Sequence, residues 1–394
     1  MTERLNINPV VLKWCREQTG YSISEVVEKI NISDTKATSK KEAVSAVQKL
    51  EKWENGKDVP SYTVLQKLAS FYKRPLLTFF MPNPPVVQNK LVDFRTLDSL
   101  PHGKDSPEFA KLKRQIFYLQ ESLSEFQKND GVEPLDFINS VSVNTNIFQF
   151  VQNIRQRLSF SYDEQRAYKK DEELFSVLRE KIEDLGVYVV IRGSFEKIPI
   201  DEFRGIAITD EYAPLILING RDVPSARTFS MMHELAHLFL GDSSVYNKFP
   251  NNRDPKEVFC NKFAAEFMMP TEEVNRIFPN RIEETSASVI MDTLSLEAKK
   301  HNVSMMTLLY RLSDVGKISS AMVQQIENTI KRRIKEKRET QEGGPDRNKI
   351  DKLYLGDKVI STVLNARDAG TISDSSASAL LNVKEYRFDR IRPK

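Results

Sequence analysis

Apolar residues recur at steps of three and four positions along most of this chain, which is the spacing of helices with one buried face. The clearest example is 107–128, where the stripe consists of Phe109, Leu112, Ile116, Leu119 and Leu123. The same spacing predicts helices over 147–158 and 171–185. Stripes of this kind are usually core, so we expect these three helices to serve as scaffold.

Three short apolar runs interrupt the helical spacing and predict β-strands, because each is bounded by turn residues. They cover 187–191, 205–208 and 215–218. A small twisted sheet packed on helices gives an α+β fold that is mostly helical. An exposed edge strand next to the helix that follows would let an extended peptide add itself to the sheet, although a sheet that serves only as core fits the pattern equally well.

The first 85 residues have the pattern of a separate, all-helical domain. Short helices are predicted at 11–18 and 24–30, a third helix ends at Asn55-Gly56, and a fourth begins after Pro60. A proline-rich segment, 81–85, follows and favours a stiff linker to the rest of the chain.

The strongest chemical signal is 233–237, which reads His-Glu-Leu-Ala-His and uses two of the chain's four histidines. Positions i and i+4 of an α-helix share a face, so His233 and His237 can bind one Zn²⁺. Glu234 can act as general base on a zinc-activated water. The surrounding apolar residues predict a buried helix that stops at Gly241. Buried polar groups are tolerated when they are paired or bind metal, so a zinc site explains them well.

A catalytic zinc site needs a third protein ligand. Glu257 is the best candidate, in a helix predicted to begin at Asp254-Pro255. Asn261 shares its face and could hold a ligating histidine in the correct tautomer. Glu266 and Cys260 are the alternatives, but Cys260 falls off that face, and a lone cysteine in a buried helix is usually a small hydrophobe.

Residues of about 185–320 resemble the ImmA/IrrE family of zinc metallopeptidases. The motifs that carry this resemblance are, in order, Leu185-Gly186-Val187, Phe203-Arg204-Gly205-Ile206-Ala207, 214–219, the His-Glu-Leu-Ala-His helix and 263–270. The resemblance implies a zincin-like domain with one zinc ion per chain, bound by His233, His237 and Glu257, and with Glu234 as the base. Mn²⁺ or Fe²⁺ would also suit these ligands. The resemblance further implies a narrow range of protein substrates, such as a repressor or antitoxin-like protein that is encoded nearby.

The N-terminal region resembles the Cro/cI-like (XRE) helix-turn-helix domain, through Trp53-Glu54-Asn55-Gly56-Lys57 and 71–80. In such domains the third helix enters the major groove of DNA. The residues that the resemblance places at DNA are Ser45, Gln48, Lys49, Lys52 and Lys57. However, 33–41 lengthens a turn that normally has only a few residues. A domain that keeps the fold and binds only protein is therefore the alternative.

Bulk properties narrow the setting. The chain has 58 basic and 55 acidic residues and a net charge of +3, so any affinity for nucleic acid must come from local patches. Two cysteines cannot form a disulfide framework, which agrees with a cytoplasmic protein. No apolar stretch is long enough for a membrane span, and the N-terminus lacks an apolar secretory region.

The expected domains are a helix-turn-helix at 1–85, a linker with an amphipathic helix at 86–130, a metallopeptidase domain at 131–330 and a basic helical region at 331–394.

One hypothesis is a regulatory zinc endopeptidase with a DNA-binding domain for transcriptional control. The alternative is a DNA-binding or antitoxin-like regulator whose metal site is structural or a sensor. Glu234 favours the first, because a structural site needs no base. His301 and Tyr246 are additional candidates near the site, although a histidine at a helix start usually lies on the surface. The oligomeric state is left open.

Overall fold

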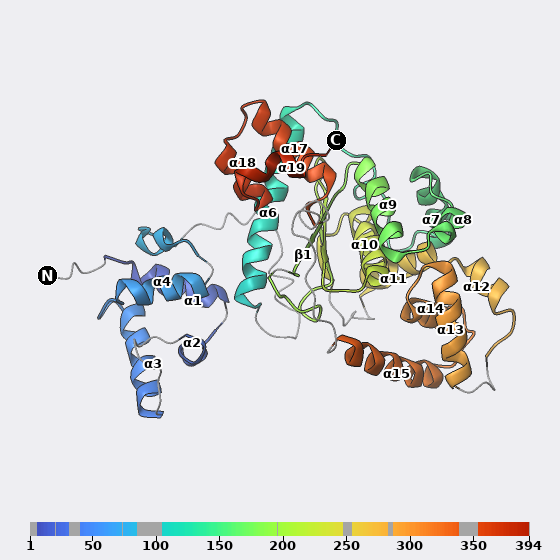
Figure 1. Ribbon diagram of the computed structural model, residues 1–394, viewed down its shortest axis with the longest axis horizontal. Coiled ribbons are helices and arrows are strands. Elements are labelled where there is room, and N and C mark those ends of the chain that lie inside the picture. Colours follow the sequence, from blue (N-terminus) through green and yellow to red (C-terminus); the bar gives the residue numbers. More distant parts are fainter. Residues whose placement is uncertain are drawn as a thin grey trace. The chain divides into compact units, whose positions relative to one another are not determined.

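Two units with separate cores make up the chain, residues 1–114 and 115–394 (Figure 1). The computed structural model describes residues 6–19, 21–30, 40–72, 74–84, 105–194, 196–246, 254–282, 287–338 and 354–393. Helix α6, Pro107–Asn129, runs through the boundary between the two units. Each unit is considered by itself below.

The first unit is helical, as the sequence predicted. Its elements are α1 (Pro9–Thr19), α2 (Ile23–Lys29), α3 (Lys40–Glu54), α4 (Tyr62–Phe71) and the 3-10 helix η1 (Leu76–Phe80). Leu12, Leu50, Leu65 and Leu68 are fully buried at its centre. The long turn that we expected before the third helix lies largely in 31–39, outside the described residues.

The second unit contains a four-stranded sheet with the order β1-β3-β2-β4. Its strands are β1 (Tyr188–Arg192), β2 (Gly205–Ile208), β3 (Leu215–Asn219) and β4 (Ser244–Tyr246). β1 runs parallel to β3, whereas β2 is antiparallel to both β3 and β4. The sequence predicted the first three strands. β4 was missed, and it pairs with Gly205 to Ala207, so β2 has a neighbour on each side there.

Most of the second unit is helical. Its helices after α6 are α7 (Ile147–Arg157), α8 (Tyr162–Ala167), α9 (Asp171–Asp184), α10 (Pro224–Phe239), α11 (Pro255–Met268), α12 (Thr271–Ile277), α13 (Ala287–His301), α14 (Met305–Asp314), α15 (Ser320–Arg338), α17 (Asp357–Asp368), α18 (Asp374–Leu381), η2 (Glu385–Arg387) and α19 (Phe388–Ile391). The unit therefore has the mostly helical α+β composition that the sequence predicted.

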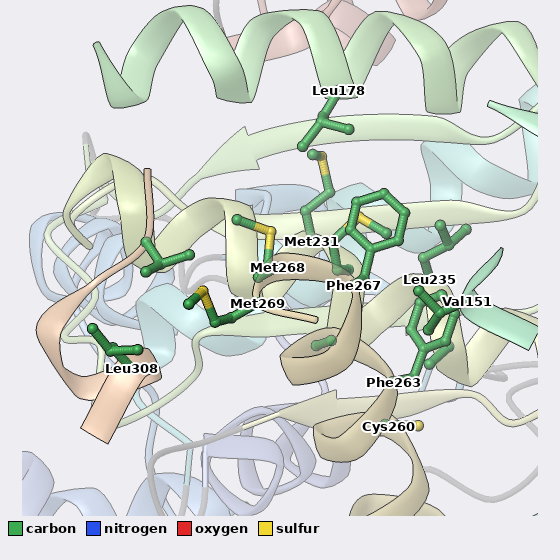
Figure 2. Packing of buried hydrophobic residues seen from close by; sticks show 14 of the residues in the cluster. Val151, Leu178, Met231, Leu235, Cys260, Phe263, Phe267, Met268, Met269 and Leu308 are labelled. Carbon is green, nitrogen blue, oxygen red and sulfur yellow. The ribbon is translucent and has the colours of Figure 1, made fainter. Parts of the chain in front are cut away.

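The main core lies between the sheet and helices α9, α10 and α11. Figure 2 shows part of it, with Leu178 of α9, Met231 and Leu235 of α10, and Phe263 and Phe267 of α11. Because α10 is buried on almost every side, its polar side chains must find partners inside the protein. This burial sets the conditions for the chemistry of 233–237.

Helix α6 and the C-terminal helices also contact the sheet region. Gln120 donates a hydrogen bond to the carbonyl of Ala213, and Gln127 donates one to the Tyr188 hydroxyl. The Tyr188 hydroxyl also lies 3.2 Å from that of Thr362 on α17. Residues 354–393 therefore pack within the second unit. No helix among the described residues combines the length and the apolar character that a membrane crossing requires.

Candidate metal centre

Helix α10 brings the two motif histidines together on one face. Both side chains are fully buried, and their Nε2 atoms lie 3.2 Å apart. The helix begins at Pro224 and ends in a Schellman turn, in which Gly241 donates its N–H to the carbonyl of Leu238 and Asp242 donates to that of His237. Gly241 has a φ of +66°, in the left-handed region that this turn requires.

Helix α11 supplies the third side chain. It begins at Pro255 with Asp254 as its cap, as the sequence predicted, and this places Glu257 in the first turn. The Glu257 carboxylate oxygens lie 3.4 Å from His233 Nε2 and 3.4 Å from His237 Nε2. The three potential ligand atoms all lie within 4.8 Å of one another. The structure thus brings together the residues that we expected to bind metal.

The two histidine nitrogens and the Glu257 carboxylate are spaced closely enough to bind one metal ion. Zn–N and Zn–O bonds of about 2.0–2.1 Å put neighbouring tetrahedral ligand atoms about 3.3–3.4 Å apart. The two histidine Nε2 atoms lie 3.2 Å apart, and each lies 3.4 Å from a different oxygen of Glu257. Glu257 Oε2 is also buried without a hydrogen-bond partner among the described residues. Buried polar atoms are normally satisfied, so a cation beside Glu257 Oε2 would give this oxygen a partner.

Glu234 lies where its carboxylate can handle protons. Ser244 on β4 donates a hydrogen bond of 3.1 Å to Oε2, whereas Oε1 has no hydrogen-bond partner in the described structure. Gly205 on β2 makes room for this carboxylate, because a Cβ there would lie 2.4 Å from Oε1. Burial raises the pKa of Glu234 to about 8. A carboxylate with a pKa near neutrality is well suited to accept and return a proton.

The ionisation of Glu257 differs from that of Glu234. Burial opposes its negative charge, but the attraction of the adjacent His233 and His237 outweighs burial and holds its pKa well below the ordinary value. Glu257 is therefore ionised at neutral pH, as a metal ligand must be. The pKa values of the two glutamates are thus shifted in opposite directions. The low pKa of Glu257 suits a metal ligand, whereas the raised pKa of Glu234 suits a group that exchanges protons.

Two further side chains contact the histidines. Asn261 lies one turn after Glu257 on α11, and its side chain interacts with His233. Asp242 lies 3.2 Å from His237 Nδ1 and also accepts a 2.6 Å hydrogen bond from Lys256. Asp242, Ser244 and the role of Gly205 were missed by the sequence reasoning. The available signal was an aspartate directly after the glycine that ends the metal helix.

Neither of the two alternative third ligands, Glu266 and Cys260, is placed or ionised as a metal ligand would be. Glu266 is paired with Arg311 and accepts a 2.6 Å hydrogen bond from Thr271. Cys260 hydrogen-bonds to His237, but it does not belong to the group of converging ligand atoms. Burial raises the pKa of its thiol to about 11, so Cys260 stays neutral. Glu257 is therefore the third side chain that the geometry favours.

The two additional candidates are placed differently from each other. His301, which we expected on the surface, is buried at the end of α13, and its Nδ1 lies 2.7 Å from the Tyr162 hydroxyl. That expectation was wrong, because Tyr162 and Glu297 provide polar partners inside the protein. Tyr246 ends β4, and its side chain lies outside the described part.

In the first unit, the residues expected at DNA lie on or just after α3. Gln48, Lys49 and Lys52 have exposed side chains on this helix, and Lys57 is exposed in the turn that follows. Ser45 is also on α3, but its side chain lies outside the described part. The exposed residues are free to meet a ligand, which DNA binding would require.

Comparison with known protein families adds one finding. Residues 182–313 match the model of Peptidase_M78, the IrrE N-terminal-like domain. This M78 segment contains His233, Glu234, His237 and Glu257, and it supports a metallopeptidase-type function that uses a metal ion, typically zinc. No match was found among curated proteins.

Proposed function

We propose that the chain is a zinc-dependent regulatory endopeptidase with an N-terminal DNA-binding unit. One observation carries the peptidase part: His233, His237 and Glu257 converge beside a buried Glu234 with an unpartnered oxygen. The three converging side chains would hold the ion. Bound zinc would supply Lewis acidity for the scissile carbonyl and for the attacking water. The M78 match supports the same reaction class.

Glu234 performs the proton transfers in this proposal. Its Oε1 takes the proton from the attacking water and returns it to the nitrogen of the leaving amine. Ser244 holds the other oxygen, so the carboxylate keeps one orientation during both transfers. Burial raises the pKa of Glu234 to about 8. It therefore stabilises the protonated form of Glu234 that exists between the two transfers.

The sheet supports a protein as substrate. Among the described residues, β4 pairs with β2 on one side and has no strand on the other. Ser244 at the start of β4 contacts Glu234, so an extended peptide that adds to β4 would pass close to the base. We propose that this peptide belongs to a specific, locally encoded repressor or antitoxin-like protein in the cytoplasm. Such a substrate range is narrow.

Replacement of Glu234 tests this function. Wild type should bind about one zinc ion per chain. Glu234→Gln should retain the zinc and lower the rate of cleavage of the neighbouring gene's product by about 10²–10⁴-fold. Metal content and cleavage are measured on the same preparations. Glu272→Gln, an exposed glutamate on α12, is the matched control and should cleave normally.

Two results would contradict the proposal. Wild type that binds no metal would exclude a metallopeptidase. Glu234→Gln that keeps both its zinc and its full biological activity would make the metal structural or sensory, and the chain would then be a binding regulator.

We also propose that α3 of the first unit contacts DNA. Gln can read adenine and Lys can contact guanine or phosphate, and both types are exposed on this helix. Binding to the chain's own promoter should weaken with salt and be lost in Gln48→Ala plus Lys49→Ala. The control is Lys13→Ala plus Gln18→Ala, the same residue types on α1. Absence of binding at low salt would show that the unit serves another purpose.

A further inference from the structure

The turn after α10 contains an aspartate that holds a metal-centre histidine at two points. The backbone N–H of Asp242 donates to the carbonyl of His237 at 2.9 Å. Its carboxylate Oδ2 lies 3.2 Å from His237 Nδ1. The side-chain contact therefore comes from a residue whose backbone position is already fixed by the Schellman turn.

This contact determines which nitrogen of His237 faces the other ligands. An ionised carboxylate only accepts hydrogen bonds, so His237 Nδ1 must carry the proton in the contact. His237 Nε2 then presents its lone pair, and it lies 3.2 Å from His233 Nε2 and 3.4 Å from Glu257. Partners of this kind fix the orientation of a ligating histidine and raise its basicity.

A lysine from the next helix holds the same carboxylate. Lys256 Nζ lies 2.6 Å from Asp242 Oδ1, and Lys256 directly precedes Glu257 on α11. The two Asp242 oxygens thus have separate partners, His237 on α10 and Lys256 on α11. The ion pair between Asp242 and Lys256 therefore connects α10, which carries His233 and His237, to α11, which carries Glu257.

The Asp242 side chain is not needed to end α10. Gly241 adopts the left-handed conformation and donates to Leu238, and the backbone of Asp242 completes the turn. Removal of the carboxylate would leave all of these features in place. The side chain therefore acts on His237 and not on the helix end.

We propose that Asp242 is a positioning residue of the metal centre, which fixes the tautomer and orientation of His237, and that Lys256 holds Asp242 in place for this task. The inference rests on the proposed function, because it assigns roles around the same metal ion. It adds two residues that do not themselves touch the metal.

Zinc affinity tests the inference in the full-length chain. The zinc dissociation constant is measured by competition with a chromophoric chelator for wild type, Asp242→Ala, Asp242→Asn and Lys256→Met. Asp242→Ala should weaken zinc binding about 10–100-fold. Asp242→Asn should fall between wild type and Asp242→Ala, because it keeps an acceptor oxygen but loses the charge. Lys256→Met should weaken binding less than Asp242→Ala.

Two further measurements separate positioning from a structural role. The visible absorption of the Co²⁺-substituted protein, which reports ligand geometry, should change in Asp242→Ala. Unfolding of the metal-free protein should change by at most about 1 kcal/mol in Asp242→Ala, the cost of the partly exposed pair with Lys256. The matched control is Asp136→Ala, which removes an exposed aspartate paired with Arg157 at 2.6 Å. This control should change neither zinc affinity nor the Co²⁺ spectrum.

The outcomes distinguish the inference from the proposed function. If wild type binds zinc and Asp242→Ala binds it as tightly, the positioning role is overturned while the peptidase proposal stands. If wild type binds no zinc, both are overturned. If Asp242→Ala fails to fold, Asp242→Asn decides, and an affinity equal to wild type overturns the role.

Discussion

Glu234 can lie against the backbone of β2 because residue 205 has no side chain. A Cβ at this position would lie 2.4 Å from Oε1, 2.7 Å from Cγ and 2.8 Å from Cδ of Glu234. The neighbouring strand β4 holds the other carboxylate oxygen through Ser244. The orientation of the Glu234 carboxylate is therefore set by the sheet and not by α10 alone.

Gly205→Ala should abolish most of the peptidase activity without removing the metal. The added methyl group cannot coexist with the present Glu234 carboxylate, because the three atoms nearest to it all belong to Glu234. Cleavage rate and zinc content are measured together. Gly316→Ala is the control, because nothing lies within 4 Å of its Cβ and it should only cost about 1–2 kcal/mol of backbone strain. Normal cleavage by Gly205→Ala would show that the carboxylate moves freely.

At this scale, the sequence could predict those site residues that follow helix geometry. His233 and His237 share a face by their spacing, and Glu257 follows from the helix start at Asp254-Pro255. Ser244 and Gly205 depend on the pairing of β4 with β2, which brings distant positions together. The spacing of apolar residues along the sequence does not predict that strand pairing.

Among the elements, α11 ends without a glycine and is held by side chains from three other helices. The carbonyl groups of Phe267, Met268 and Met269 accept hydrogen bonds from Arg155, Gln165 and Arg311, respectively. Terminal carbonyl groups of a helix need such partners when they are buried. Arg155 lies on α7 and Gln165 on α8, so a helix that we expected to be scaffold, 147–158, also holds the end of α11.

Arg311→Met should destabilise the second unit by about 3–5 kcal/mol, because it leaves the buried Glu266 carboxylate without its ionic partner. The free energy of unfolding is measured by denaturant titration. Glu266→Gln added to Arg311→Met should recover part of the loss, since no unpaired charge then remains. The control Lys170→Met breaks an exposed pair with Glu173 and should cost at most about 1 kcal/mol. Equal effects of the two single changes would contradict this account.

The elements show the same division between what was predictable and what was not. The strands β1, β2 and β3 are apolar runs that are fully buried, so their composition marks them. β4 has only three residues, Ser-Val-Tyr, and is a strand because β2 pairs with it. A strand this short is defined by tertiary structure and leaves no apolar run in the sequence.

On the scale of the whole molecule, each unit has its own core, and one unit alone contains tryptophan. Both tryptophans, Trp14 and Trp53, belong to the first unit, whereas the candidate metal centre belongs to the second. The sequence predicted separate N-terminal and metal-binding regions from a change in pattern and a proline-rich segment. Because the two cores are separate, we expect a metal ion to change the stability of the second unit and not that of the first.

Zinc should therefore raise the stability of one unit only. At a free zinc concentration of 100 times the dissociation constant, binding adds about 2.7 kcal/mol to the folded state that contains the site. Unfolding followed by tryptophan fluorescence should keep its midpoint when zinc is added, and far-UV circular dichroism should show a transition that moves upward. Chelator should reverse the shift. A zinc-dependent shift of the tryptophan signal would show that the two units unfold together.

The position of Glu257 on a different helix from the two histidines has a further consequence. An ion held by His237 and Glu257 closes the chain between α10 and α11 into a loop. Such a closure joins the two helices only in the folded chain, because the site does not persist in the unfolded chain, and it ends when the ion leaves. The metal would thus serve as a reversible crosslink in a chain whose two cysteines form none.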